Sequence, residues 1–186
     1  GPFYYSMGQW SSPWGIEFHI DFLAVFVLLT LTGVGFLILL YGTKDLIHEL
    51  KEDVIGWYYT LYLLIVASML GMALTNDLFN LFVFIEICAI ASCAIISIKE
   101  NRECIEASLK YLILSAVGSG ALLLGIALIY MVTGHLNFSE VAASLPEAIS
   151  LYPRNILAAM ALFMVGIGVK AALFPLHVWL PDAHSS

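Results

Sequence analysis

Five long apolar stretches constrain the fold of this chain more than any other feature of its sequence. A helix needs about 20 apolar residues to cross the hydrocarbon core of a bilayer, and each stretch is long enough. The chain is 61% hydrophobic and only 11% charged, which excludes an ordinary soluble domain. No alternating strand pattern competes, so we predict an all-α, polytopic transmembrane helix bundle with about five membrane-spanning helices. The predicted spans are Phe22–Tyr41, Gly56–Thr75, Leu78–Ile98, Tyr111–Thr133 and Ile156–Phe174.

The lysine and arginine residues predict the orientation of these helices, because they concentrate in cytoplasmic loops. The segment before Phe22 and the Asn76–Asp77 link contain neither residue type. The Gly42–Ile55 link contains two of them, Lys99–Lys110 contains three, and Gly134–Asn155 contains one. We therefore expect an external N-terminal segment, cytoplasmic first and third links, and a last span that runs inward.

Two ionisable residues lie within the predicted spans, Glu86 in the third and Lys170 in the fifth. A charge at the bilayer centre costs roughly 2.5–3.5 kcal/mol on insertion scales, so such residues by default mark ion or proton pathways. Their opposite signs, on two different helices, suggest a proton-handling pair. Small residues on the face of Glu86 (Ala89, Cys93 and Ser97) would let another helix approach closely. The alternatives are a protonated carboxyl that merely packs, and a lysine that snorkels to the interface.

Prolines follow Lys170 closely, and we expect Pro175 and Pro181 to interrupt the last span. An ionisable amine would then lie about one turn before the interruption, where carbonyl groups and water can gather. Histidine titrates near neutral pH, so His177 and His184 are candidate proton relays. A structural role for either histidine is an equally open interpretation.

Motifs for enzyme chemistry are missing from the sequence. It contains no nucleotide-binding glycine pattern, zinc motif or nucleophile elbow, and its three cysteines lack metal or redox spacing. We expect no catalytic site, no cofactor and no metal site in this chain.

Two charged motifs resemble the antiporter-like subunits of respiratory complex I, which share ancestry with Mrp-type sodium/proton antiporters and group 4 membrane-bound hydrogenases. The first motif is DLFNLFVFIE at Asp77–Glu86, and the second is VKAALFPLHVWLPDAH at Val169–His184. Ala107–Gly120 resembles the helix between them in that family. Gly15-Ile16 and Asp21–Leu23 resemble the external approach to the family's third helix.

By this resemblance, Glu86 matches the glutamate on the family's fifth transmembrane helix and Lys170 the lysine on its seventh. Lys110, on the intervening helix, joins His177 and His184 as a further candidate for the ion pathway. Family members have about fourteen helices with two inverted five-helix repeats. Residues 1–186 would form a single transmembrane domain that resembles most of the first repeat. We expect a fragment, a split subunit or a degenerate copy.

The resemblance implies a proton or sodium/proton translocating subunit, or part of one, in a redox-driven membrane complex. Its partners would be other membrane subunits, the lipid bilayer and H⁺ or Na⁺, with no nucleic acid. It would be a multi-pass protein of a prokaryotic plasma membrane. The alternative is a truncated, non-pumping structural subunit that bridges its neighbours.

Overall fold

The protein is described by a computed structural model that covers residues 2–12 and 14–185. The described residues form seven α-helices, preceded by a short two-stranded hairpin and a 3₁₀ turn. Five of the helices are long and apolar enough to cross a membrane, which confirms the predicted fold class. These five are α1 (Phe22–Glu49), α2 (Glu52–Leu74), α3 (Leu78–Ile96), α4 (Arg102–Thr133) and α6 (Pro153–Lys170). The shorter elements are β1 (Phe3–Ser6), β2 (Glu17–Ile20), α5 (Phe138–Leu151) and α7 (Trp179–Ser185).

Polar side chains determine where three of the long helices begin. The Asp21 carboxylate accepts a hydrogen bond from the backbone of Ala24 at 2.7 Å and caps α1. Asp77 caps α3 in the same way, and the Asn101 side chain caps α4. Such caps satisfy backbone N–H groups that lack a partner within the helix. α1 and α3 therefore begin where the sequence predicts.

Other boundaries differ from the prediction. α1 continues past Tyr41 to Glu49, and α4 begins at Arg102 rather than at Tyr111. Hydropathy detects the part of a helix that lipid covers, whereas the hydrogen-bonded helix continues into polar sequence. The two extensions lie at one end of the bundle, where Lys99 pairs with Glu49 at 3.1 Å.

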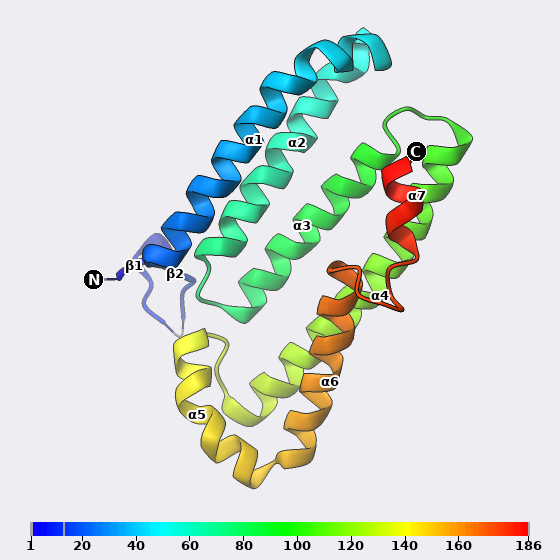
Figure 1. Ribbon diagram of the computed structural model, residues 1–186. Coiled ribbons are helices and arrows are strands. Elements are labelled where there is room, and N and C mark those ends of the chain that lie inside the picture. The colour runs from blue at the N-terminus through cyan, green and yellow to red at the C-terminus, as the bar shows by residue number, and fades with distance from the viewer. Residues whose placement is uncertain (1, 13, 186) are drawn as a thin grey trace.

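The longest predicted link, Gly134–Asn155, contains the helix α5. Ala148 of α5 joins a buried cluster with Ile129 of α4 and Ile156 and Ala159 of α6. α5 thus folds back against the helices on either side of it (Figure 1). It is too short and too polar for a search for membrane spans to detect it.

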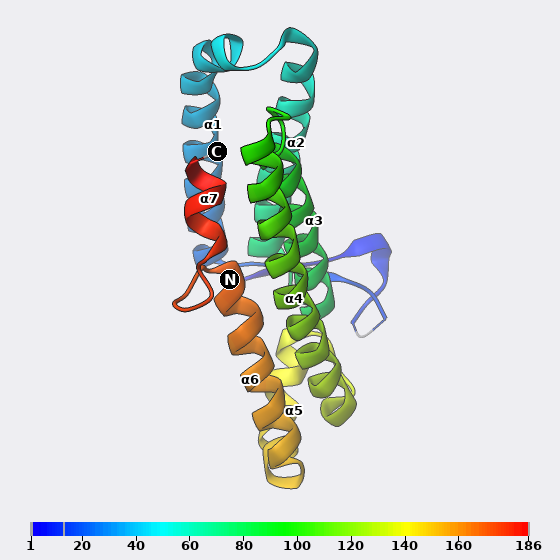
Figure 2. The ribbon, with the colours of Figure 1, turned by 90° about the vertical axis from the view of Figure 1, so that its right-hand side faces the viewer.

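The long helices form a row in which each packs against its neighbour. α1 contacts α2, α2 contacts α3, and α3 contacts α4. α6 and α7 both contact α4 and follow one another along its length, as Figure 2 shows. Glu86 on α3 and Lys170 at the end of α6 therefore flank the same helix.

The last span is interrupted, but not at both predicted prolines. α6 ends at Lys170, Ala172 has a φ of 51°, and Pro175 lies between α6 and α7. Pro181 is instead within the first turn of α7. A proline is tolerated there because backbone N–H groups in the first turn have no partner within the helix. The prediction that Pro181 breaks the helix was wrong.

The N-terminal hairpin, which the sequence did not predict, contacts the ends of α1 and α2 and the links at Asn76 and Asn137. The backbone of Asn76 donates to Glu17 at 2.9 Å, and Phe138 donates to Asn76 at 3.0 Å. The Glu17 carboxylate also accepts hydrogen bonds from the side chains of Asn76 and Asn137, at 3.1 and 3.3 Å. The segments predicted to be external therefore share one end of the molecule.

Candidate functional site

Glu86 and Lys170 meet in space. The Lys170 Nζ lies 3.5 Å from the Glu86 Oε1, although the two residues belong to α3 and α6. The Lys170 side chain is 18% exposed and that of Glu86 is 31% exposed. The structure thus places the two charges beside one another, as a proton-handling pair requires.

Two serines of α4 complete this site. The Ser119 hydroxyl donates a hydrogen bond to the Glu86 Oε1. The Lys170 Nζ donates to the Ser115 Oγ at 2.5 Å. Both serines are only 4% exposed, and they lie one turn apart on the face of α4 that meets the pair.

Sequence reasoning did not assign these serines to the site. The available signal was a group of small residues (Ser115, Gly118 and Ser119) on one face of an apolar helix. That pattern indicates close helix packing, and it does not reveal which side chains the hydroxyl groups reach.

Close contact between α4 and α6 brings the groups together. A methyl group at Gly166 would lie 2.8 Å from the Gly118 carbonyl oxygen. One at Gly118 would lie 2.8 Å from the Val169 Cβ. Only hydrogen fits at either position, so the two backbones approach closely beside Lys170.

α3 also packs on α4 through small residues. The Ser108 hydroxyl donates to the Cys93 carbonyl at 2.8 Å, and the Cys93 Sγ lies 3.0 Å from the Ser108 Oγ. Ala89 is buried. The expectation that the Glu86 face points into the bundle is confirmed.

The interruption after Lys170 is hydrogen-bonded within the chain. The Val169 carbonyl accepts from the Trp179 indole at 3.0 Å and from the Ala172 backbone at 3.2 Å. Leu173 donates to the Gly168 carbonyl at 2.9 Å. The Trp179 ring also packs edge-on against Tyr111 of α4, with centroids 4.9 Å apart. Protein groups therefore bind the last-turn carbonyls of Gly168 and Val169, where the sequence suggested that water could gather.

His177 lies within this interruption, and His184 lies beyond it on α7. His177 packs near Phe174, with ring centroids 5.6 Å apart. Its Nδ1 is buried without a hydrogen-bond partner among the described residues. His184, on α7, lines a hollow of about 340 Å³ together with Tyr111 and Trp179. Across residues 2–12 and 14–185, neither histidine forms a hydrogen bond or an ion pair with Glu86 or Lys170.

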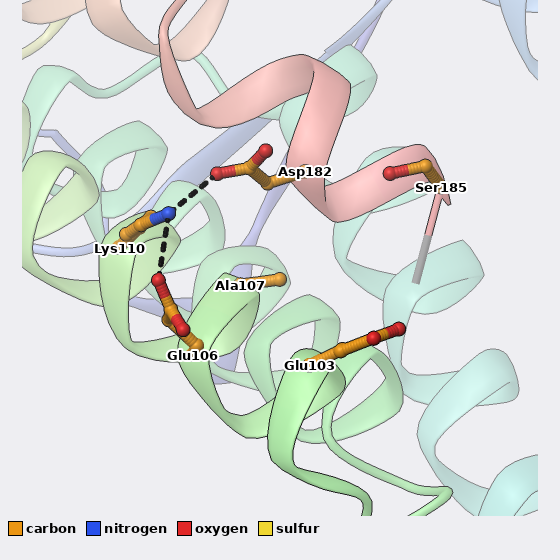
Figure 3. A pocket seen from close by; sticks show the side chains of 6 residues that line it. All are labelled: Glu103, Glu106, Ala107, Lys110, Asp182 and Ser185. Atoms are coloured by element: carbon orange, nitrogen blue, oxygen red, sulfur yellow. Dashed lines mark hydrogen bonds and ion pairs between the residues drawn. The ribbon is translucent and has the colours of Figure 1, made fainter.

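Lys110 lies nearer the start of α4 and pairs with different partners. Its Nζ is 2.9 Å from Asp182 of α7 and 3.0 Å from Glu106, as Figure 3 shows. The two ion pairs border a hollow of about 250 Å³ that Glu103, Ala107 and Ser185 also line. Lys110 thus contacts α7 from α4 and does not contact the Glu86–Lys170 pair.

The central site can hold a proton at either of two groups. An amine and a carboxyl lie in contact, each bonded to a hydroxyl group that can donate or accept. The distance between two buried opposite charges determines how strongly each group binds its proton. Within the part of the chain that the structure describes, no three His, Cys, Asp or Glu residues come together in a way that could hold a metal ion.

The sequence of the chain is similar to those of known membrane proteins. Residues 75–186, which include Glu86 and Lys170, match the family described as NADH:quinone oxidoreductase/Mrp antiporter, TM. An NADH-quinone oxidoreductase subunit of Desulforudis audaxviator is 39% identical over 184 residues, covering 99% of this chain and 36% of that protein. A Na⁺/H⁺ antiporter subunit of Alkalihalophilus pseudofirmus is 32% identical over 178 residues, covering 96% of this chain and 35% of that protein.

The fold is also similar to that of a protein of known structure. A chain of the membrane-bound sulfane sulfur reductase, an archaeal respiratory membrane complex, superposes with a TM-score of 0.87 at 37% identity. That match covers 96% of this chain and 35% of the other. The chain spans about a third of the length of the curated relatives it matches. It is a multi-pass integral membrane protein, and it belongs to the transmembrane family of NADH:quinone oxidoreductase and Mrp antiporter subunits.

Proposed function

We propose that this chain is part of an antiporter-like subunit that translocates protons, or exchanges sodium for protons, within a multi-subunit membrane complex. The observation that carries the proposal is the contact between Glu86 and Lys170 inside membrane-spanning helices. A structural bundle needs neither charge, and both are costly to keep in the membrane. The names of the two relatives, a subunit of NADH-quinone oxidoreductase and a subunit of a Na⁺/H⁺ antiporter, support the same assignment.

In this proposal Lys170 binds and releases the transported proton, and Glu86 sets how strongly the lysine binds it. Moving Glu86 away from Lys170, or neutralising it, changes the electrostatic environment of the amine. His177, His184 and Lys110 are assigned to the ion pathway between this pair and the α7 end of the bundle. None of the three contacts the pair directly, so water or small movements of α7 would connect them.

The chain is proposed to supply one part of a longer path. In inverted-repeat transporters the ion site lies between two repeats, and residues 1–186 resemble most of one. Moving one charge against 100 mV costs about 2.3 kcal/mol, so the energy comes from elsewhere in the complex. We assign that role to a redox reaction in partner subunits, and no catalytic site to this chain.

The test compares Glu86→Gln and Lys170→Met with Glu147→Gln and Lys44→Met, in the full-length protein within its native complex. Glu147 and Lys44 are exposed residues outside the central site, so they control for loss of charge as such. Proton and sodium uptake into inverted membrane vesicles is measured, with assembly checked for every variant. We expect the first two variants to lose ion uptake while the complex assembles, and the two controls to keep it. Normal uptake by Glu86→Gln and Lys170→Met would favour the structural, non-pumping role instead.

A further inference from the structure

The two buried serines of α4 have a chemical property that the charged pair lacks. A hydroxyl group is both a donor and an acceptor, whereas a carboxylate only accepts and an ammonium only donates. Ser119 is bonded to the Glu86 carboxylate and Ser115 to the Lys170 amine, at 2.5 Å for the second pair. The direct distance between the two charged groups is longer, at 3.5 Å. The shortest polar contact of Lys170 is therefore to a hydroxyl group rather than to its counter-ion.

We infer that Ser115 and Ser119 are positioning residues that hold Glu86 and Lys170 apart at a fixed separation and stabilise each of them in both protonation states. When Lys170 is an ammonium, the Ser115 oxygen accepts one of its N–H groups. When Lys170 is a neutral amine, the same hydroxyl rotates and donates to the nitrogen lone pair. In the same way, the Ser119 hydroxyl donates a hydrogen bond to Glu86 when it is a carboxylate and accepts one when it is a carboxylic acid.

Close backbone packing fixes the position of the two serines relative to α6. The serines lie one turn apart on the same face of α4, and Gly118 between them contacts α6 closely. The position of α6, and with it the start of the Lys170 side chain, is thereby fixed relative to both hydroxyl groups. Rotation of its O–H bond then lets each hydroxyl group bond to its charged partner in either protonation state.

The role in ion movement rests on the proposed function, but the hydrogen bond to Glu86 can be tested separately. Infrared difference spectroscopy of the full-length protein detects carboxyl groups, and the band that disappears in Glu86→Gln belongs to Glu86. Its frequency responds to hydrogen bonding. We expect Ser119→Ala to shift that band. Ser108→Ala is the matched control, since Ser108 is similarly buried on α4 and bonds to Cys93 instead.

Ion uptake by the native complex in inverted vesicles is the second measurement. Loss of a hydrogen bond to a charged group predicts a decrease of roughly tenfold in uptake rate for Ser115→Ala and for Ser119→Ala. We expect Ser108→Ala to change neither the rate nor the band. An unshifted Glu86 band in Ser119→Ala, or equal loss of rate in all three variants, would overturn the inference. If Glu86→Gln and Lys170→Met translocate normally, the proposed function fails, and the band shift still decides whether Ser119 holds Glu86.

Discussion

Two ion pairs join the interrupted helix to the rest of the bundle, and they differ in burial and in length. Lys110 and Asp182 are 2.9 Å apart with side chains 48% and 43% exposed. Lys170 and Glu86 are 3.5 Å apart with side chains only 18% and 31% exposed. Water screens the first pair, so its short distance yields little net stabilisation. The second pair is longer, but removing one partner leaves a charge that water reaches poorly. Burial, rather than distance, therefore decides which pair is more sensitive to the loss of one partner.

The sharpest test of this difference is a double-mutant cycle on the buried pair. Glu86→Gln and Lys170→Met are each expected to reduce ion uptake strongly, because each leaves its partner without a counter-charge. The double variant should lose less than the sum, with a coupling of about 1–3 kcal/mol in the apparent activation free energy. Uptake rates and assembly are measured for all four proteins. Additive losses in log rate would mean that the residues act independently.

The glycine contact beside the buried pair is expected to be the next most sensitive feature. Gly118→Ala places a methyl group 2.8 Å from the Val169 Cβ, so the helices must separate. Overpacking of this kind costs about 1–3 kcal/mol. Gly120→Ala is the control on the same helix, since no atom lies within 4 Å of the added methyl group. Thermal unfolding of the purified full-length protein should give a lower Tm for Gly118→Ala only; equal Tm values would contradict the close crossing.

The exposed pair should tolerate a change that the buried pair does not. Lys110→Gln removes the ion pairs to Asp182 and Glu106, but solvent and salt already screen these charges. Trp179 still packs on Tyr111 and donates to Val169, so α7 keeps its position. We expect amide hydrogen exchange in α7 to rise slightly and assembly to be normal. Exchange as fast as in an unfolded peptide would show that the ion pair holds α7 in place.

The last prediction concerns Asp77, which caps α3 at the end of the bundle opposite Lys110. Desolvation raises the pKa of Asp77, and hydrogen bonds from backbone N–H groups oppose the shift only in part. Because the folded protein then binds the proton more tightly than the unfolded chain, stability falls as the pH rises through the raised pKa. Asp77→Asn keeps the cap and should remove this dependence, whereas Asp77→Ala should cost about 1 kcal/mol. Both variants lack the carboxyl group, so neither should show this pH dependence, and the free energy of unfolding distinguishes them. An unchanged pH dependence in Asp77→Asn would contradict the assignment.

The segments of this molecule that cross the bilayer could be predicted from the sequence. Runs of about 20 apolar residues identify the spans, and isolated charges such as Glu86 and Lys170 stand out within them. Helical segments outside the lipid give no such signal, so the extension of α1 to Glu49 and the whole of α5 were missed. The N-terminal hairpin was missed because each of its strands is only four residues long.

The site was predictable only in its charged members. That Glu86 and Lys170 touch depends on how α3 and α6 cross α4, which spacing along the chain does not determine. Ser115 and Ser119 were missed because serine is common in helices, and only the three-dimensional structure shows what a hydroxyl group reaches. Lys110 was placed in the ion pathway by resemblance; its pairing with Glu106 follows from helical spacing, but its contact with Asp182 does not.

The Glu17 carboxylate, which binds Asn76 and Asn137, has a mechanical consequence for the whole bundle. One side chain accepts amide hydrogen bonds from the α2–α3 link and from the α4–α5 link, so those helix ends are held at a fixed distance. If α3 and α4 separate, they must therefore rotate about this end. Glu86 lies nine residues beyond Asp77 on α3, roughly 13 Å along the helix axis, so it is displaced through a longer arc than the anchored end. A small rotation at the anchored end becomes a larger change in the distance from Glu86 to Lys170.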